Sequence, residues 1–129
     1  MEEFATLPDI DSVEVLRLAS DYEPVPRQPS IPGRVLTRLV GEPAHRVASL
    51  WRALLEAEPM RCHLPRYGLR FHGPELALEA ALCFRCNNVS IIKNGEHAWA
   101  TFDGEAAAAR ELLSIMRSFD PSTDAGGKA

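Results

Sequence analysis

The feature that most constrains this chain is a period-two pattern of apolar residues between Leu69 and Phe102. Successive side chains of a β-strand point to opposite faces, so this period predicts strands with one buried face. Three turn signals divide the pattern, and the last of them is the strongest hairpin signal in the chain: Gly73-Pro74, Asn87-Asn88 and Asn94-Gly95. The segment therefore predicts a four-stranded antiparallel meander.

The preceding part of the chain predicts two more strands. Ser12 to Ser20 is rich in strand-forming residues, although its alternation slips between Val15 and Leu16, which predicts a bulge. Gly33 to Val40 suits either a strand or a helix by period, and its alternation of arginine with apolar residues favours the strand.

Two helices complete the predicted fold. Apolar residues at three- and four-residue spacing predict one helix from Pro43 to Glu58 and another from Gly104 to Phe119, which Asp103 can cap. We therefore predict a single α+β domain over residues 1–120, with an antiparallel sheet of five or six strands and both helices on one face. The other face is the predicted functional surface. Residues 1–10 predict a loose arm, and residues 121–129 predict a disordered tail.

Charge and composition narrow the classes of partner. The chain has 129 residues, a formal net charge of −4 and three cysteines. An acidic balance argues against a nucleic-acid partner, because phosphates require a basic surface. No apolar stretch approaches the roughly 20 residues of a membrane span, and the first residues are acidic where a signal peptide is basic. We therefore expect a cytoplasmic protein without a membrane partner.

The cysteines are predicted to gather at one end of the sheet. If Gly73-Pro74 is the centre of a tight turn, Leu64 lies opposite Cys83 and Cys62 opposite Arg85. Reduced, buried thiols are the expected state, and a disulfide is one alternative. The other alternative is zinc, because Cys83 and Cys86 have a two-residue gap typical of zinc ligands. Its predicted ligands are Cys62, His63, Cys83 and Cys86.

The sequence indicates no enzyme. It contains no glycine-rich phosphate loop, nucleophile elbow, paired-histidine zinc helix or calcium loop. A small enzyme with Cys83 or Cys86 as its nucleophile is a further hypothesis. It requires an accessible, activated thiolate at one of these positions. We expect no cofactor apart from the zinc of the alternative interpretation.

Two segments carry a resemblance to other proteins. Residues 62–70 read Cys-His-Leu-Pro-Arg-Tyr-Gly-Leu-Arg, and residues 83–86 read Cys-Phe-Arg-Cys. They resemble a set of small uncharacterised bacterial proteins with a Cys-x-x-Pro-Arg-x-Gly-Leu-Arg segment and a Cys-Phe-x-Cys turn. The resemblance covers about the second half of the chain and implies a bacterial α+β domain. In its small size and acidic charge the chain is also similar, in a general way, to bacterial toxin-immunity proteins.

These features predict a non-enzymatic protein-binding module, specifically an immunity protein that neutralises a bacterial toxin by occluding its active site. Acidic side chains of the N-terminal arm and the meander are expected to steer the protein toward a basic rim. The alternative is a zinc-stabilised structural or regulatory domain. The predicted partner-binding residues are Glu79, Arg70, His72, Arg85 and Asp103.

Overall fold

A computed structural model shows one α+β domain, built on a six-stranded antiparallel sheet of order β2-β1-β3-β4-β5-β6. The structure describes residues 2–24, 28–58, 60 and 62–121, so the predicted tail at 121–129 lies outside the described residues except for its first residue. The elements are α1 (Glu2–Ala5), β1 (Ser12–Arg17), β2 (Arg34–Val40), α2 (Glu42–Arg52), β3 (Tyr67–Gly73), β4 (Leu76–Cys83), β5 (Asn88–Lys93), β6 (Glu96–Thr101) and α3 (Ala107–Ser118).

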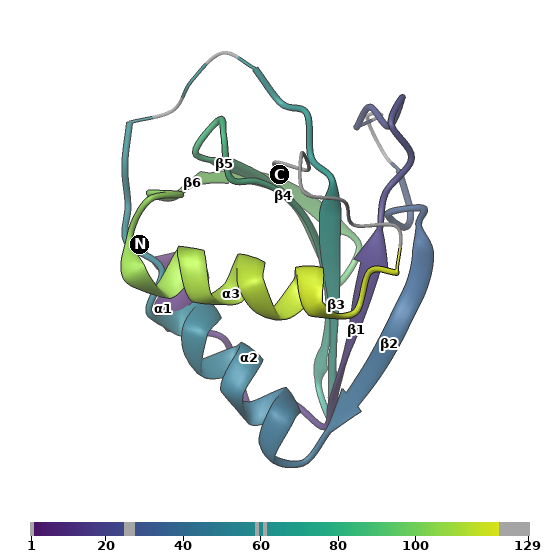
Figure 1. Cartoon of the computed structure of the whole chain (residues 1–129). Coiled ribbons are helices and arrows are strands. Elements are labelled where there is room, and N and C mark those ends of the chain that lie inside the picture. Colours follow the sequence, from purple (N-terminus) through teal and green to yellow (C-terminus); the bar gives the residue numbers. More distant parts are fainter. Residues whose placement is uncertain (1, 25–27, 59, 61, 122–129) are drawn as a thin grey trace.

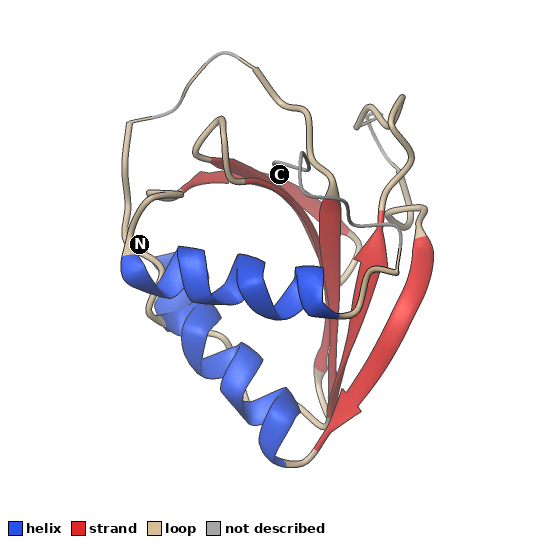
Figure 2. Cartoon of the chain, viewed as in Figure 1, coloured by secondary structure: helices blue, strands red, loops and turns tan. Residues whose placement is uncertain are grey.

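The helices lie on one side of the sheet, and the sheet curves around them (Figures 1 and 2). Each strand turns its apolar face toward α2 and α3, as Leu69 and Phe71 of β3 and Leu78 and Leu82 of β4 do in the main core. The predicted fold class and the predicted meander are therefore confirmed.

Two local predictions are also confirmed. The pairing of β1 with β2 shifts between Val15 and Leu16, where the alternation of the sequence slips. Asn94 and Gly95 have φ of 48° and 86° and join β5 to β6, because a two-residue hairpin turn of this kind needs left-handed backbone at both positions.

The predicted turn between β3 and β4 is misplaced. Gly73 pairs with Leu76, so the central residues of the turn are Pro74 and Glu75. The register therefore moves by two residues, which leaves every side chain on its predicted face because the period of a strand is two. Regular pairing ends at Tyr67 opposite Leu82, and the predicted opposition of Cys62 to Arg85 does not form.

The first long helix is shorter than predicted. It ends at Arg52 because the chain then turns toward the sheet, and the backbone carbonyl of Leu55 accepts a hydrogen bond from the Asp103 N–H at 2.7 Å. Leu54 is buried, whereas Leu55 is 60% exposed, although the helical spacing assigned both to the core. Residues 53–66 consequently form a long connection, and its described residues, 53–58, 60 and 62–66, lie in no helix or strand.

The N-terminal segment is part of the core and not a loose arm. It forms the short helix α1, and Phe4, Leu7 and Ile10 are buried. The ring of Phe4 is fully buried and meets Trp51 edge-on at 5.1 Å and Phe102 at 6.3 Å between centroids. The apolar residues are too widely spaced for a periodic signal, so their burial depends on tertiary packing.

The outer face of the sheet is partly covered, contrary to the prediction of one open side. The connection between β1 and β2 folds over this face and forms a second, smaller core. This core holds side chains from the connection against residues of three strands: Leu16, Leu18, Tyr22, Ile31, Ala81 and Ile92.

The buried N-terminal segment leads to a first prediction. Phe4→Ala should lower the free energy of unfolding by about 3–5 kcal/mol, because it removes a ring from a closed aromatic cluster. Val40→Ala, at a position that is 57% exposed, serves as the control and should change stability by less than about 0.5 kcal/mol. Urea denaturation followed by circular dichroism measures both. Equal stability of the two variants would show that residues 2–10 are a loose arm.

Candidate functional site

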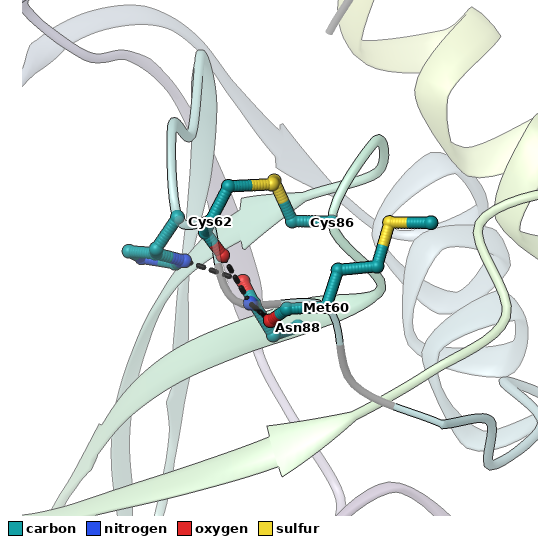
Figure 3. The surroundings of a disulfide bond; sticks show 5 residues. Met60, Cys62, Cys86 and Asn88 are labelled. Atoms are coloured by element: carbon teal, nitrogen blue, oxygen red, sulfur yellow. Dashed lines mark hydrogen bonds between the residues drawn. A yellow bond between two sulfur atoms is a disulfide. The ribbon is translucent and has the colours of Figure 1, made fainter.

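The candidate site is the 53–66 connection where it crosses the end of the sheet (Figure 1). A disulfide joins Cys62 to Cys86, with their Cα atoms 5.6 Å apart. The amide of Asn88 donates to the carbonyl oxygens of Cys62 and Met60 at 2.6 and 3.3 Å, and its oxygen contacts Nδ1 of His63 at 2.5 Å (Figure 3). One side chain of β5 therefore holds three residues of the connection beside the disulfide.

Backbone contacts fix the same end of the molecule. The N–H of Met60 donates to the carbonyl of Cys86 at 3.1 Å. The chain after β6 packs on the turn between β4 and β5, where a Cβ at Gly104 would lie 2.0 Å from the carbonyl oxygen of Phe84. The N–H of Gly104 also donates to the side-chain oxygen of Asn87 at 3.0 Å. Close backbone approach at Gly104 thus brings the segment between β6 and α3 against the β4–β5 turn, which contains Cys86.

The cysteines do come together at one end of the sheet, but not as three reduced thiols. Cys62 and Cys86 are oxidised, and Cys83 is a buried free thiol. Oxidised cysteines do not bind zinc as thiolates, so the zinc interpretation requires a different state of these two residues. In residues 2–24, 28–58, 60 and 62–121, no three His, Cys, Asp or Glu side chains are placed to hold a metal ion.

An exposed tryptophan lies beside the anchored connection. Trp99 of β6 is 51% exposed and stands between two histidine rings. The ring of His63 meets it edge-on at 4.7 Å, and the ring of His97 does so at 5.6 Å. Contact between His63 and Trp99 therefore couples the connection to the edge strand.

His63 is held as a neutral side chain. Burial lowers its pKa from the ordinary value of 6.5, and nearby His97 lowers the pKa further, against the opposing effect of the hydrogen bond to Asn88. Its Nε2 is buried and makes no hydrogen bond to the described residues. Protonation would place a charge at this buried atom, and this is why burial disfavours the charged form.

A polar pair on the outer face does not make an accessible catalytic group. Ser90 Oγ lies 3.0 Å from Nε2 of His97, but Ser90 is only 1% exposed. Tyr22 lies on the same side and has a raised pKa, mainly because it is buried, with the charge of Glu79 adding to the effect and the hydrogen bond to Ser90 opposing it. The hydroxyl of Ser90 is therefore enclosed beneath the β1–β2 connection.

Arg70 and Glu79, two predicted partner-binding residues, lie on the outer face as expected but hold the β1–β2 connection. The carboxylate of Glu79 accepts hydrogen bonds from the Ile31 N–H at 2.9 Å, the Ser30 hydroxyl at 2.8 Å and Arg70 Nε at 3.1 Å. Arg70 also donates to the carbonyl of Ile31 at 2.8 Å. Both side chains are thus engaged within the molecule.

The other three predicted residues are spread over the surface. His72 contacts Glu14 at 3.1 Å near the far end of β3. Arg85 is exposed in the β4–β5 turn, and Asp103 follows β6, where its carboxylate accepts the Glu105 N–H at 2.9 Å. Asp103 precedes the helix but is not its N-cap residue, which is Ala106. Arg85 and Asp103 lie at the end of the sheet that bears the disulfide, whereas His72 does not.

The sequence pattern does not predict the exposed apolar side chains, which lie mainly on this site. Four of the six exposed large hydrophobic residues among the described positions belong to the connection or to β6: Leu55, Met60, Leu64 and Trp99. Leu55 continues the helical spacing of apolar residues, and Trp99 lies in the alternating pattern of a strand. The periodicity of the sequence therefore does not indicate that either side chain is exposed. Pro59 and Pro65 on either side of Cys62 are the signal that marks an irregular, surface-running segment.

Comparison with protein-family models, with curated proteins and with solved structures finds no match. Among the described residues, no helix has the length and apolar character needed to cross a membrane.

The buried His63 leads to a second prediction. The pKa of His63 is lower in the folded chain than in the unfolded chain, so the unfolded chain takes up the proton first as the pH falls below about 6.5. The contribution of His63 to stability is therefore complete above that pH and decreases below it. His63→Gln should flatten the decline in unfolding free energy between pH 7.5 and 5.5, measured by urea denaturation. The exposed His45 of α2 provides the control, His45→Gln, which should keep the wild-type decline; identical profiles for both variants would contradict the assignment.

Proposed function

We propose that this chain is a non-catalytic binding module for a protein partner, and that it acts as an immunity protein by occluding the active site of a toxin. The observation that carries the proposal is a connection that is exposed and anchored at once. Met60 and Leu64 are 55% and 64% exposed, yet they flank a disulfide and the contacts of Asn88. Anchoring favours binding because side chains that are already ordered lose less entropy in a complex.

Trp99 extends this surface onto β6. Tryptophan is enriched among the residues that dominate the energy of protein interfaces, because it buries a large area with few rotatable bonds. Here its orientation is set by two neighbouring rings, those of His63 and His97. We therefore assign Trp99 as the central contact of the proposed interface.

Charge favours a basic partner. Glu56 and Glu58 are exposed on the connection, Asp103 donates its backbone N–H to Leu55, and Glu105 is exposed two residues later. Acidic side chains around an apolar contact accelerate association with a basic surface and favour its orientation. A toxin whose active site has a basic rim has this chemistry. These acids include Asp103 of the sequence prediction, and Glu56, Glu58 and Glu105 join it on this side of the molecule.

The enclosed polar groups also support a binding role. Ser90, the hydroxyl that contacts a histidine, is buried, and Glu79 is occupied by the β1–β2 connection. Nucleophilic catalysis requires an accessible nucleophile beside its base. The exposed side chains of the 53–66 connection are instead mainly apolar and acidic, as Leu55, Glu56 and Glu58 are.

The proposed surface is tested by replacing Leu55 or Trp99 with the photo-crosslinking residue p-benzoylphenylalanine in the cells that make this protein. Both positions should crosslink to the same protein, which should suppress growth when expressed alone and not when expressed with this chain. The control is the same replacement at Val40, which is exposed on the opposite edge strand β2. Equal crosslinking from position 40 would place the interface elsewhere.

Affinity for the captured protein then provides the quantitative prediction. Trp99→Ala should weaken binding at least tenfold, about 1.4 kcal/mol, while Val40→Ala leaves the affinity unchanged. Glu58→Lys should slow association at low ionic strength and have a smaller effect at high salt, because salt screens exposed charges. Unchanged affinity of Trp99→Ala, or growth suppression that this chain does not relieve, would overturn the proposed function.

A further inference from the structure

The third cysteine lies next to the disulfide. Cys83 is the last residue of β4, is fully buried, and pairs directly with Asn88 of β5. Directly opposed residues of antiparallel strands share one face, with Cβ atoms about 4.5–5.5 Å apart. Because the Asn88 amide donates a hydrogen bond to the carbonyl of Cys62, the thiol of Cys83 lies in the same small region as the disulfide.

The turn geometry allows a second pairing of the cysteines. The N–H of Cys86 donates to the carbonyl of Cys83 at 3.3 Å, so residues 83–86 form a hydrogen-bonded turn. The first and last Cα atoms of such a turn are within about 7 Å, and disulfides span Cα separations of about 4.4–6.8 Å. The Cα separation of such a turn thus overlaps the range that a Cys83–Cys86 bond requires.

Exposure distinguishes the three positions. Cys83 and Cys86 are buried, whereas Cys62 is exposed on the 53–66 connection. A thiolate that leaves from Cys62 would be solvated, whereas a thiolate that leaves from Cys86 would stay buried. Desolvation disfavours the charged form of a thiol, so Cys62 is the better leaving group.

We propose that the three cysteines form a thiol–disulfide exchange site, in which Cys83 displaces Cys62 from Cys86. The exchange removes the covalent bond between the 53–66 connection and the β4–β5 turn. The sulfur of Cys83, after loss of its proton, attacks Sγ of Cys86. The Cys62–Cys86 bond breaks as the Cys83–Cys86 bond forms, and Cys62 leaves as a thiolate that takes up a proton. The number of disulfides stays constant, so the step requires no external oxidant or reductant.

The exchange changes a surface and not the core. The Cys62–Cys86 bond is one attachment of the connection, and the hydrogen bonds that Asn88 donates to Met60 and Cys62 are another, so the exchange removes one of these attachments. An exposed Cys62 thiol then becomes available to an external disulfide of the glutathione class. The exchange does not depend on the proposed binding function, although Met60 and Leu64 lie within two residues of the Cys62 bond that it breaks.

Trapping by iodoacetamide tests the proposal. The native, oxidised protein is incubated with the reagent at pH 8, quenched with acid, and mapped by mass spectrometry without reduction. We expect Cys62 to be alkylated over time, with a Cys83–Cys86 disulfide in the same molecules. The rate should become independent of reagent concentration at high concentration, because exchange then limits trapping. In Cys83→Ala, labelling of Cys62 should fall at least tenfold.

A second variant keeps the test decisive if the buried site does not tolerate Cys83→Ala. Cys62→Ser retains both cysteines of the turn, and air oxidation should join them in the folded protein. Circular dichroism at the same pH checks that each variant is folded. Alkylation of Cys83 with Cys62–Cys86 intact, no alkylation of the native protein, or two free thiols in oxidised Cys62→Ser would each overturn the proposal.

Discussion

The site depends on one anchorage, the attachment of residues 53–66 to the end of β5 through Asn88 and the Cys62–Cys86 disulfide. The described residues of this connection lie in no helix or strand, and each ordered backbone residue costs roughly 1–2 kcal/mol of conformational entropy. A cross-link between residues 24 positions apart offsets about 3 kcal/mol of this cost by restricting the unfolded chain. The Asn88 amide adds order by satisfying two carbonyl groups that the connection would otherwise present to solvent.

The two faces of the sheet explain why the site lies at an end and not on the outer surface. One face is filled by the helices, and the other is partly filled by the β1–β2 connection around Leu18 and Ile31. Glu79 holds that connection through the Ile31 N–H and the Ser30 hydroxyl. The remaining exposed apolar surface is concentrated on residues 53–66 and on Trp99 of the edge strand. A binding role therefore belongs to the end of the sheet where these residues meet the disulfide.

Much of the fold could be predicted because strand period and turn chemistry are local. The bulge at Val15 and Leu16 and the Asn94-Gly95 hairpin follow from a few adjacent residues, so the sequence predicts them correctly. The end of α2, the burial of Phe4 and the partners of Glu79 depend on contacts across the fold, and no local pattern contains them. The same holds for the cysteines: their proximity follows from strand order, whereas the choice of Cys86 as the partner of Cys62 depends on how an irregular connection returns to the sheet.

Disulfide mapping of the folded protein tests the central claim most directly. The protein is held in an oxidising buffer, its thiols are blocked in acid to prevent exchange, and its peptides are separated without reduction. We expect most molecules to contain a Cys62–Cys86 bond and Cys83 to be the blocked thiol. A predominant bond between Cys83 and either other cysteine, or three blocked thiols, would contradict the anchorage on which the site is built.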